Sequence, residues 1–450
     1  MGKDLEADIN TERKVLVITY YWPPLGGSGV QRWLKFVKYL PEFGITPYVF
    51  TPENPSFDVR DESLEKDVPA EAEVIRFPIW EPYGVFFRLS GGKDKQANTP
   101  TRLVAQKQKG LFQRIATWIR GNMFIPDPRV FWVKPSAKFL TDFVRDNRIR
   151  TIITTGPPHS IHLIGYHLKK KNPTLRWIAD FRDPWSEWGF LDSLGVGSFA
   201  RNIHRRQEQE VLRTADVITT ITPFYVRRFE ALSGKKVHLL TNGYDQSDFE
   251  NIAPVRTPDF VIRHVGIVNE KCNPRPFMAA VKEVMANKSD FAAHVRIDFV
   301  GEVHAAFREY VESDDALRAI TTFTPSVPHK QLISMYNTSS VLLLVLEGYK
   351  DAEGYMPGKL FEYIATGLPV LGVGPENGDA AELLSSCQCG SMISAQDKQR
   401  IVTTLLELHR QWQQGSHSPN RIVDHRFSRR ALTEQLVNEI ILQKRNGNDQ

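Results

Sequence analysis

Short apolar runs alternate with amphipathic stretches along most of the 450 residues. The first run, Lys14–Tyr20, is nearly unbroken and rich in β-branched residues, which is typical of a strand buried on both faces of a parallel sheet. A helical pattern follows, with apolar residues at i, i+3, i+4 and i+7 from Val30 to Val37. The further predicted strands are Ile45–Thr51, Glu73–Phe77, Thr151–Gly156, a strand that begins at Arg176, Val217–Thr222, Lys236–Leu240, Phe260–Val268, Val295–Val300, Ile320–Phe323, Val341–Leu346 and Pro369–Val373.

This alternation predicts an α/β protein with doubly wound parallel sheets. A chain of 450 residues exceeds one comfortable core, because domains average about 150 residues. The segment Asn251–Asp259 contains two prolines and is the predicted linker. We therefore predict a Rossmann-like domain over 1–250 with an insertion at about 80–135, a second one over 259–425, and a terminal helix over 426–450 that packs on the first.

The composition of the chain indicates the kind of cellular compartment in which it folds. Hydrophobic residues make up 41% and charged residues 24% of the chain, as in ordinary soluble proteins. No apolar run reaches the length of a membrane span, and the segment Met1–Glu12 lacks the pattern of a signal peptide. Three cysteines, an odd number, favour a reducing compartment. We expect a cytoplasmic protein.

The most informative stretch is Glu353–Gly374, which predicts a loop, a short helix and a buried strand. Pro357 suits the first helical position, and Gly367 suits a left-handed cap. The helix has an apolar stripe, which comprises Leu360, Phe361, Ile364 and Leu368. Its opposite, polar stripe comprises Lys359, Glu362 and Thr366.

The polar stripe has the chemistry of a nucleotide site. The free amides of Gly358 and Lys359, the helix dipole and the Lys359 ammonium together form an anion site that fits a phosphate. Glu362, one turn further on, is an acceptor that can receive two hydrogen bonds from the diol of a ribose. The pair indicates a nucleoside diphosphate.

The segment Pro357–Val370 resembles the nucleotide-binding signature of retaining glycosyltransferases of family 4 (group 1), of the bacterial surface-glycan type, which have the GT-B fold. The resemblance implies two Rossmann-like domains facing a cleft, a nucleotide-diphosphate sugar as donor, and Glu362 on its ribose. The family has a second Glu eight residues earlier, where this chain has Gly354, and Glu353 is the neighbouring candidate for the sugar.

Two glycine-containing loops also match the family. The turn Tyr21–Gly29 follows the first predicted strand, and the resemblance places Gly27 and Gly29 near the donor phosphate and the acceptor; the alternative is a turn that needs glycine for backbone reasons alone. The loop that contains Gly266 resembles the diphosphate loop, in which a basic residue meets the leaving phosphate. Arg275 is the predicted residue, with Lys271 in reserve.

A third motif, Asp-Phe-Arg-Asp-Pro-Trp at Asp180–Trp185, lies where a strand ends. Ligands of open α/β sheets bind at such ends, so Arg182 and Asp183 are predicted catalytic residues. An ion pair between Arg182 and either aspartate is the alternative. His159, at the start of the preceding predicted helix, is a weaker candidate for contact with the acceptor or sugar.

No Asp-x-Asp pair occurs, so we predict no metal and no other cofactor. Loss of the diphosphate places negative charge on the leaving group, which Arg275, Lys359 and the Gly358 amide are predicted to stabilise. The alternatives are a nucleotide-sugar epimerase or hydrolase of this fold and a scaffold subunit without activity. An NAD-dependent oxidoreductase fits less well, because the fingerprint glycines are missing.

The segment 88–138 has eleven Lys or Arg and two Asp, a net charge of +9. It contains Leu111–Arg120, an amphipathic pattern with Phe, Trp and Arg that suits the surface of an anionic membrane. The alternative is a helix packed on its own domain. We expect a glycan or lipid-linked acceptor, a peripheral contact with the inner face of the membrane, and no nucleic-acid partner.

Overall fold

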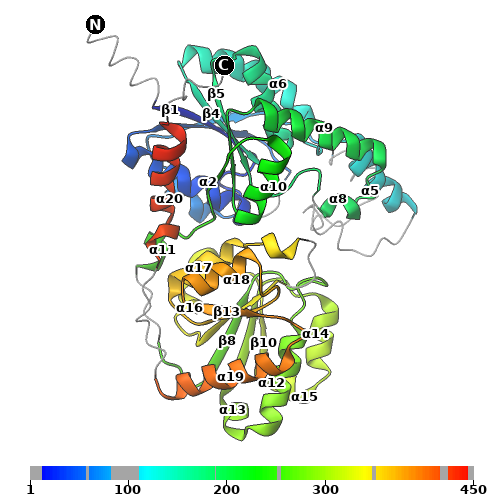
Figure 1. Cartoon of the computed structure of the whole chain (residues 1–450), viewed down its shortest axis with the longest axis vertical. Coiled ribbons are helices and arrows are strands. Elements are labelled where there is room, and N and C mark those ends of the chain that lie inside the picture. The colour runs from blue at the N-terminus through cyan, green and yellow to red at the C-terminus, as the bar shows by residue number, and fades with distance from the viewer. Residues whose placement is uncertain are drawn as a thin grey trace. The chain divides into compact units, whose positions relative to one another are not determined.

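The computed structural model describes residues 13–56, 60–82, 111–187, 189–250, 255–346, 351–415 and 424–443 (Figure 1). The chain forms two compact units. The first comprises Met1–Ile221, Tyr225–Thr241 and Leu432–Gln450, and the second comprises Thr222–Phe224 and Asn242–Ala431. Each unit contains one parallel sheet with helices around it, which confirms the predicted α/β class with two Rossmann-like sheets.

The first unit has a seven-stranded sheet in the order β3-β2-β1-β4-β5-β6-β7. All of its ladders are parallel, and Val15 pairs with Pro47 on one side and with Thr151 on the other. Its strands are β1 (Lys14–Ile18), β2 (Thr46–Pro52), β3 (Glu73–Phe77), β4 (Thr151–Gly156), β5 (Arg176–Phe181), β6 (Val217–Thr220) and β7 (Val237–Leu239).

Helices cover this sheet, and two of them, α10 and α20, are divided between the units. The last helical turns of the chain belong to the core of the first unit, because Leu436, Val437 and Ile440 are buried in one cluster with Val15 and Trp33. The helices are α2 (Ser28–Tyr39), η1 (Leu40–Phe43), η2 (Glu62–Asp67), α5 (Leu111–Met123), α6 (Val130–Asp146), α7 (Ser160–Lys171), α8 (Phe190–Ser193), α9 (Ser198–Thr214), α10 (Pro223–Ser233), α20 (Arg429–Gln435) and the π-helix η5 (Leu436–Ile441).

The second unit has a six-stranded parallel sheet in the order β10-β9-β8-β11-β12-β13. Its elements are α11 (Gln246–Phe249), β8 (Phe260–Val265), α12 (Arg275–Asn287), α13 (Ser289–His294), β9 (Val295–Val300), α14 (Ala305–Glu312), α15 (Asp315–Ile320), β10 (Thr321–Thr324), α16 (His329–Tyr336), β11 (Val341–Val345), η3 (Ala352–Gly354), α17 (Gly358–Thr366), β12 (Val370–Val373), α18 (Asp379–Ser386), β13 (Gly390–Ile393), α19 (Lys398–Gln413) and η4 (His425–Phe427).

Two apolar clusters show that both faces of this sheet are covered. Side chains of α12 to α15 and α19 pack on one face, and side chains of α16, α17 and α18 pack on the other. The strand order reverses between β8 and β11, because β9 lies on the other side of β8. In doubly wound sheets the carboxyl ends of the strands at such a reversal form the ligand-binding crevice.

The predicted strands are found within a few residues of their expected ends, and the structure adds β13, which the sequence analysis did not predict. Within the described residues, no helix has the length and apolar content needed to cross a bilayer. The predicted helix at Leu111–Arg120 is α5, with Ile115 and Trp118 about half exposed. Residues 83–110, which hold much of the predicted insertion, lie outside the described residues.

Candidate functional site

Two glycines bring the loops after β8 and β9 together at the reversal point of the second sheet. Gly266 follows β8 with φ 114°, and Gly301 follows β9 with φ 129°. A Cβ atom on Gly301 would lie 2.5 Å from the carbonyl oxygen of Gly266, so only glycine allows this approach. The loop that carries Gly266 is therefore held at the carboxyl edge of the sheet by direct backbone packing.

Helix α17 begins beside this loop. Pro357 is its N-cap and Gly358 its first residue, so the predicted start was one residue too early. Gly367 ends the helix in the left-handed conformation (φ 68°), as predicted. The apolar stripe is buried as predicted, but Thr366 is buried too, because its hydroxyl donates to the Tyr363 carbonyl at 2.7 Å instead of facing solvent.

Lys359 faces the Gly266 loop. Its Nζ donates to the Val265 carbonyl at 2.8 Å and lies 3.4 Å from Nε2 of His264. A Cβ on Gly266 would be 3.4 Å from the same Nζ. Burial lowers the pKa of Lys359 to about 8, and burial together with the Lys359 charge holds the pKa of His264 well below its usual value. The ammonium thus lacks a carboxylate partner among the described residues.

Glu362 lies one turn further along α17 and is half-buried. Its carboxylate accepts hydrogen bonds from Tyr336 Oη at 3.1 Å and from His329 Nε2 at 3.0 Å. Burial and the Glu362 charge raise the pKa of Tyr336 well above its usual value, so the phenol stays a donor. A carboxylate accepts about four hydrogen bonds, which leaves room for the two hydroxyls of a diol.

Two further predicted residues make no contact with this group within the described residues. Arg275, at the start of α12, is exposed; its guanidinium donates to the Ala306 carbonyl at 2.8 Å and stacks over the Tyr310 ring at 4.9 Å. Its contacts within the described residues include neither Lys359 nor Glu362. The reserve residue Lys271 is also exposed.

Glu353 is exposed and lines a cavity of about 670 Å³. Gly354, the position of the missing family Glu, is buried, and a Cβ there would lie 2.6 Å from Cγ of Phe224. The position cannot hold a Glu unless Phe224 moves. The cavity lies where β12 and β13 end, and its lining includes Asp351, Ala352, Gly374, Glu376, Asn377, Ser394 and Gln396.

In the first unit, Arg182 connects the first turn of α2, which follows β1, with the end of β4. Its guanidinium donates to the carbonyls of Gly29 and Gly156 at 3.2 Å each, and to that of Pro157. A Cβ on Gly29 would be 3.1 Å from the Tyr21 ring, which explains the need for a small residue. Gly27 has φ 92° and open space around it, so its backbone alone requires glycine.

Asp183 has no hydrogen-bond partner among the described residues. It is half-buried, and burial raises the pKa of its carboxyl group against the opposing effect of Arg182. A partly exposed carboxylate with a raised pKa at a strand end is suited to proton transfer or to contact with a polyol.

The alternative ion pair of Arg182 is wrong for Asp180, whose partner is Arg32 at 2.9 Å. Both side chains are buried, and the Asp180 carboxylate also accepts from Trp33, Thr155 and Thr219. Burial alone would raise the pKa of Asp180, but the Arg32 charge and these hydrogen bonds outweigh it and lower the pKa to about 2. Sequence patterns did not identify Arg32, which is a structural member of the core.

His159 is the N-cap residue of α7 and is only 5% exposed. Its ring stacks on Trp185 at 5.2 Å with an interplanar angle of 5°. Burial and neighbouring His162 hold its pKa well below the usual value, so the imidazole is neutral. A substrate has little access to this ring in the structure.

No protein-family model matches this chain, and no curated protein matches it by sequence. Solved structures do match: a glycosyltransferase from Rickettsia africae ESF-5 is 12% identical with a TM-score of 0.59, covering 95% of this chain and 97% of the other.

Two more solved structures match this chain with nearly the same TM-score and coverage. Sucrose-phosphate synthase from Thermosynechococcus elongatus is 15% identical (TM-score 0.58, 94% and 97% covered). A UDP-forming α,α-trehalose-phosphate synthase from Burkholderia xenovorans, in complex with glucose-6-phosphate, is 12% identical (TM-score 0.58, 95% and 99% covered). At these identities the likeness establishes the fold, with two parallel-sheet units of the GT-B type.

Proposed function

We propose that this chain is a glycosyltransferase whose second unit binds a nucleotide-diphosphate sugar. The observation that carries the proposal is the group at the reversal point, where Lys359 and the N-terminus of α17 face the Gly266 loop and Glu362 lies one turn away. A cation at a helix N-terminus suits a diphosphate, and the acceptor suits a ribose. The likeness of fold to three sugar-transferring enzymes supports the same reading.

Lys359 is proposed to stabilise the leaving diphosphate. In the structure its ammonium contacts a neutral His264 and a backbone carbonyl, and its lowered pKa of about 8 reflects that weak compensation. A bound diphosphate supplies the missing negative charge, and the interaction strengthens as charge develops on the leaving oxygen. We further propose that transfer needs no metal and retains the anomeric configuration, and that Gly358, Gly27 and Gly29 supply close backbone approaches.

Asp183 and Arg182 are proposed to act on the sugar or the acceptor. The Asp183 carboxylate has no hydrogen-bond partner within the described ranges, and Arg182 holds the carbonyl of Gly29 in the first turn of α2. Asp183→Asn is expected to lower turnover and to leave donor affinity unchanged, whereas loss of Arg182 disturbs the start of α2 as well. Arg275 and Glu353 stay secondary proposals for contact with the donor, because each is exposed and neither contacts Lys359 among the described residues.

Donor binding is the first test. Wild type, Glu362→Gln and the control Glu382→Gln, which changes an exposed Glu on α18, are titrated by calorimetry with UDP-, GDP-, ADP- and dTDP-sugars, with and without EDTA. We expect one donor class to bind wild type and the control equally and Glu362→Gln at least about tenfold more weakly, since a lost hydrogen bond to a charged group costs about 1.5–3 kcal/mol. Equal affinity for Glu362→Gln would remove the ribose assignment.

Transfer is the second test. The donor that binds is incubated with lipid-linked and soluble glycans, and products are separated by mass spectrometry. A glycosylated acceptor supports the proposal. Release of free sugar or an epimerised donor, equal with and without acceptor, would instead identify a hydrolase or epimerase.

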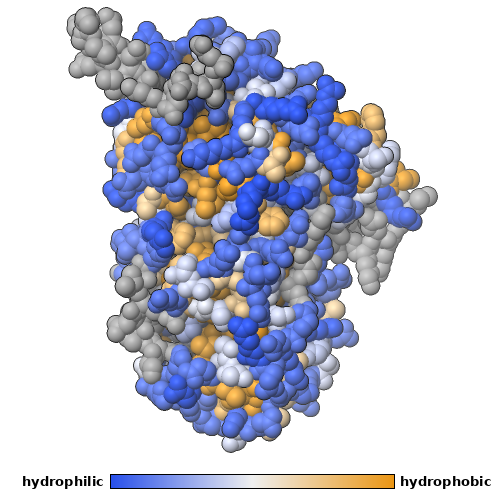
Figure 2. All heavy atoms as spheres, viewed as in Figure 1, coloured by the Kyte–Doolittle hydropathy of each residue, from blue (hydrophilic) through white to orange (hydrophobic). Residues whose placement is uncertain are grey.

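We also propose a peripheral contact with an anionic membrane through α5. Exposed apolar side chains gather on α5 and the neighbouring α9, namely Ile115, Trp118, Met123 and Phe199, and Figure 2 shows apolar surface in this part of the first unit. Flotation with anionic liposomes is expected to recover wild type and the control Val255→Ser, and less of Trp118→Ser. Recovery that is the same with neutral liposomes would contradict the proposal.

A further inference from the structure

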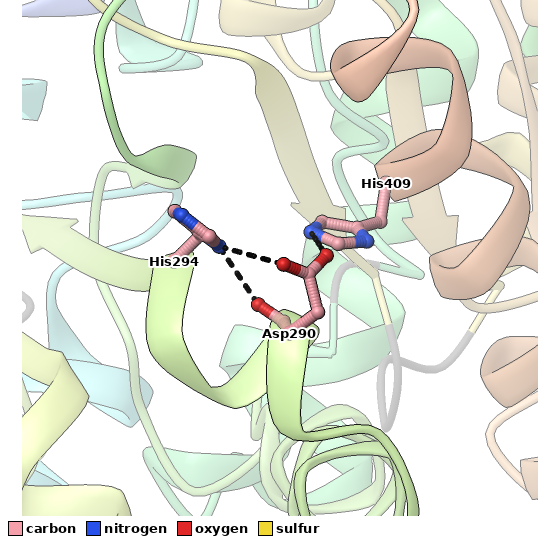
Figure 3. Close-up of side chains that lie close together, drawn as sticks. All are labelled: Asp290, His294 and His409. Atoms are coloured by element: carbon pink, nitrogen blue, oxygen red, sulfur yellow. Dashed lines mark hydrogen bonds and ion pairs between the residues drawn. The ribbon is translucent and has the colours of Figure 1, made fainter.

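Helices α13 and α19 of the second unit bring three ligand-type side chains together (Figure 3). Asp290 and His294 lie one turn apart on α13, and His409 faces them from α19. One potential ligand atom from each lies within 4.8 Å of the other two. Nδ1 of His294 is 3.5 Å from Oδ1 of Asp290, and Nε2 of His409 is 3.9 Å from Oδ2.

The cluster lies at the amino edge of the sheet, away from the donor group. His294 is followed directly by β9, and the ring of Phe260, where β8 begins, lies 5.3 Å from the His409 ring. Gly266 and Gly301 are at the other ends of these same strands. A ligand at the cluster would therefore not contact a substrate bound at the carboxyl edge.

His409 provides the second, independent observation. Its side chain is buried, at 5% exposure, between Phe291 and Trp412. Its Nε2 atom points at Asp290 and has no hydrogen-bond partner among the described residues. A buried polar atom without a partner costs free energy, so the position calls for a group that this nitrogen can bind.

We propose that Asp290, His294 and His409 form a site for a divalent transition metal of the Zn²⁺ class, with water as the fourth ligand. Metal–ligand bonds of about 2.0–2.1 Å in a tetrahedron place neighbouring ligand atoms about 3.3 Å apart. The separations of 3.5 and 3.9 Å need only small movements to reach this value, and the third pair of ligand atoms lies within 4.8 Å. Asp290 and His294 can move, because their side chains are 56% and 40% exposed.

One hydrogen bond at the cluster fits this assignment, and a second is given up when the metal binds. Gln413 donates to Oδ2 of Asp290 and orients the carboxylate. Nδ1 of His294 donates to the Asp290 carbonyl at 2.8 Å, so a metal at this nitrogen replaces the proton, which the other ring nitrogen takes. The metal would join α13 to α19, two helices that are far apart in sequence, and so stabilise the second unit without a part in the chemistry.

The test uses the full chain without a polyhistidine tag, stripped with chelator and then titrated with ZnCl₂ against a chromophoric competitor. The variants are Asp290→Asn and His294→Ala, both at exposed positions, and the control is His304→Asn. His304 lies 3.6 Å from Glu270, and the part of the chain that the structure describes offers no third ligand there. Asn can replace His304 as the N-cap of α14. Co²⁺ in place of Zn²⁺ reports tetrahedral geometry through its visible absorption.

We expect one Zn²⁺ per wild-type chain, an unfolding temperature that rises with zinc, and at least about tenfold weaker binding in both variants but not in the control. Donor affinity should be unchanged by zinc. The proposal is overturned if wild type retains no zinc against the competitor. It is equally overturned if the variants bind zinc as tightly as wild type does. Any bound zinc would then lie at another site, such as the Cys387–Cys389 segment.

Discussion

Replacing Lys359 with Met is expected to stabilise the second unit while it abolishes donor binding. Methionine keeps an apolar chain of similar length and removes the buried charge. The pKa of Lys359 falls from 10.5 to about 8, and each unit of pKa corresponds to about 1.4 kcal/mol, so the charged form destabilises the folded state by about 3 kcal/mol. The lost hydrogen bond to the Val265 carbonyl offsets about 1 kcal/mol. The net gain at pH 7 is about 2 kcal/mol.

The pH dependence of this gain distinguishes its cause. Because the folded pKa of Lys359 lies below the unfolded value, the unfolded chain binds more protons between about pH 8 and 10.5, and wild-type stability rises with pH in that window. Lys359→Met lacks this titration. Its advantage over wild type should therefore shrink from about 2 kcal/mol at pH 7 to nearly zero at about pH 9.5.

The measurement must resolve the second unit, since a chain with two units need not unfold in one step. Hydrogen exchange followed by mass spectrometry at increasing urea gives the unfolding free energy for peptides of β8 and α17. The matched control is Lys398→Met, whose side chain is 52% exposed and paired with Glu283. It should change stability by less than about 1 kcal/mol with no trend between the two pH values. A Lys359→Met variant that is less stable than wild type at pH 7, or equally different at both pH values, would refute the reasoning.

Three further outcomes are expected. Arg32→Met leaves the buried Asp180 carboxylate without its cation and should lower the free energy of unfolding in urea by about 3–5 kcal/mol. Asp180→Asn should restore part of this loss in the double variant. Because the pKa of Asp180 is lowered to about 2, the stabilising contribution of its carboxylate is present above pH 3.8 and is lost as the pH falls towards 2. Gly301→Ala places a carbon atom against the Gly266 carbonyl and should weaken donor binding at least about tenfold, or about 1.4 kcal/mol. The far-ultraviolet circular dichroism spectrum should stay unchanged. Donor binding as tight as in wild type would show that the Gly266 loop can adapt to the added carbon. Asp183→Asn should lower turnover about 100-fold or more with donor affinity within about twofold, and equal losses in both would assign it to donor binding instead.

Local patterns were enough to predict helix α17. Its apolar stripe and the glycine at its end are features of neighbouring residues, and the structure confirms both. The partners of Glu362 were beyond such reasoning, because Tyr336 and His329 lie 26 and 33 residues earlier, and only the sheet topology brings α16 beside α17. Strand β13 was missed since four residues that begin with glycine carry too little pattern.

The partners of buried or half-buried charged side chains were also beyond prediction from the sequence. Arg32 lies between Gln31 and Trp33 on α2, and these neighbours give no sign that Asp180, 148 residues later, will meet it. The motif at Asp180–Trp185 suggested a local pairing with Arg182, and the structure uses that guanidinium on backbone carbonyls instead. Nor could the sequence show that the Arg275 side chain stacks on Tyr310, since that contact depends on how α12 and α14 pack.

The first unit is built from the early part of the chain and from its last helical turns, so its core is completed late in synthesis. Its core includes Leu432, Leu436, Val437 and Ile440, which the ribosome makes only after the whole of the second unit, Asn242–Ala431. At about 5–20 residues per second, roughly 190 residues take about 10–40 s to translate. During that time the earlier part of the first unit exposes the apolar surface that η5 later covers. The second unit, which is nearly contiguous, can fold first, so the order of folding is expected to run against the order of the chain.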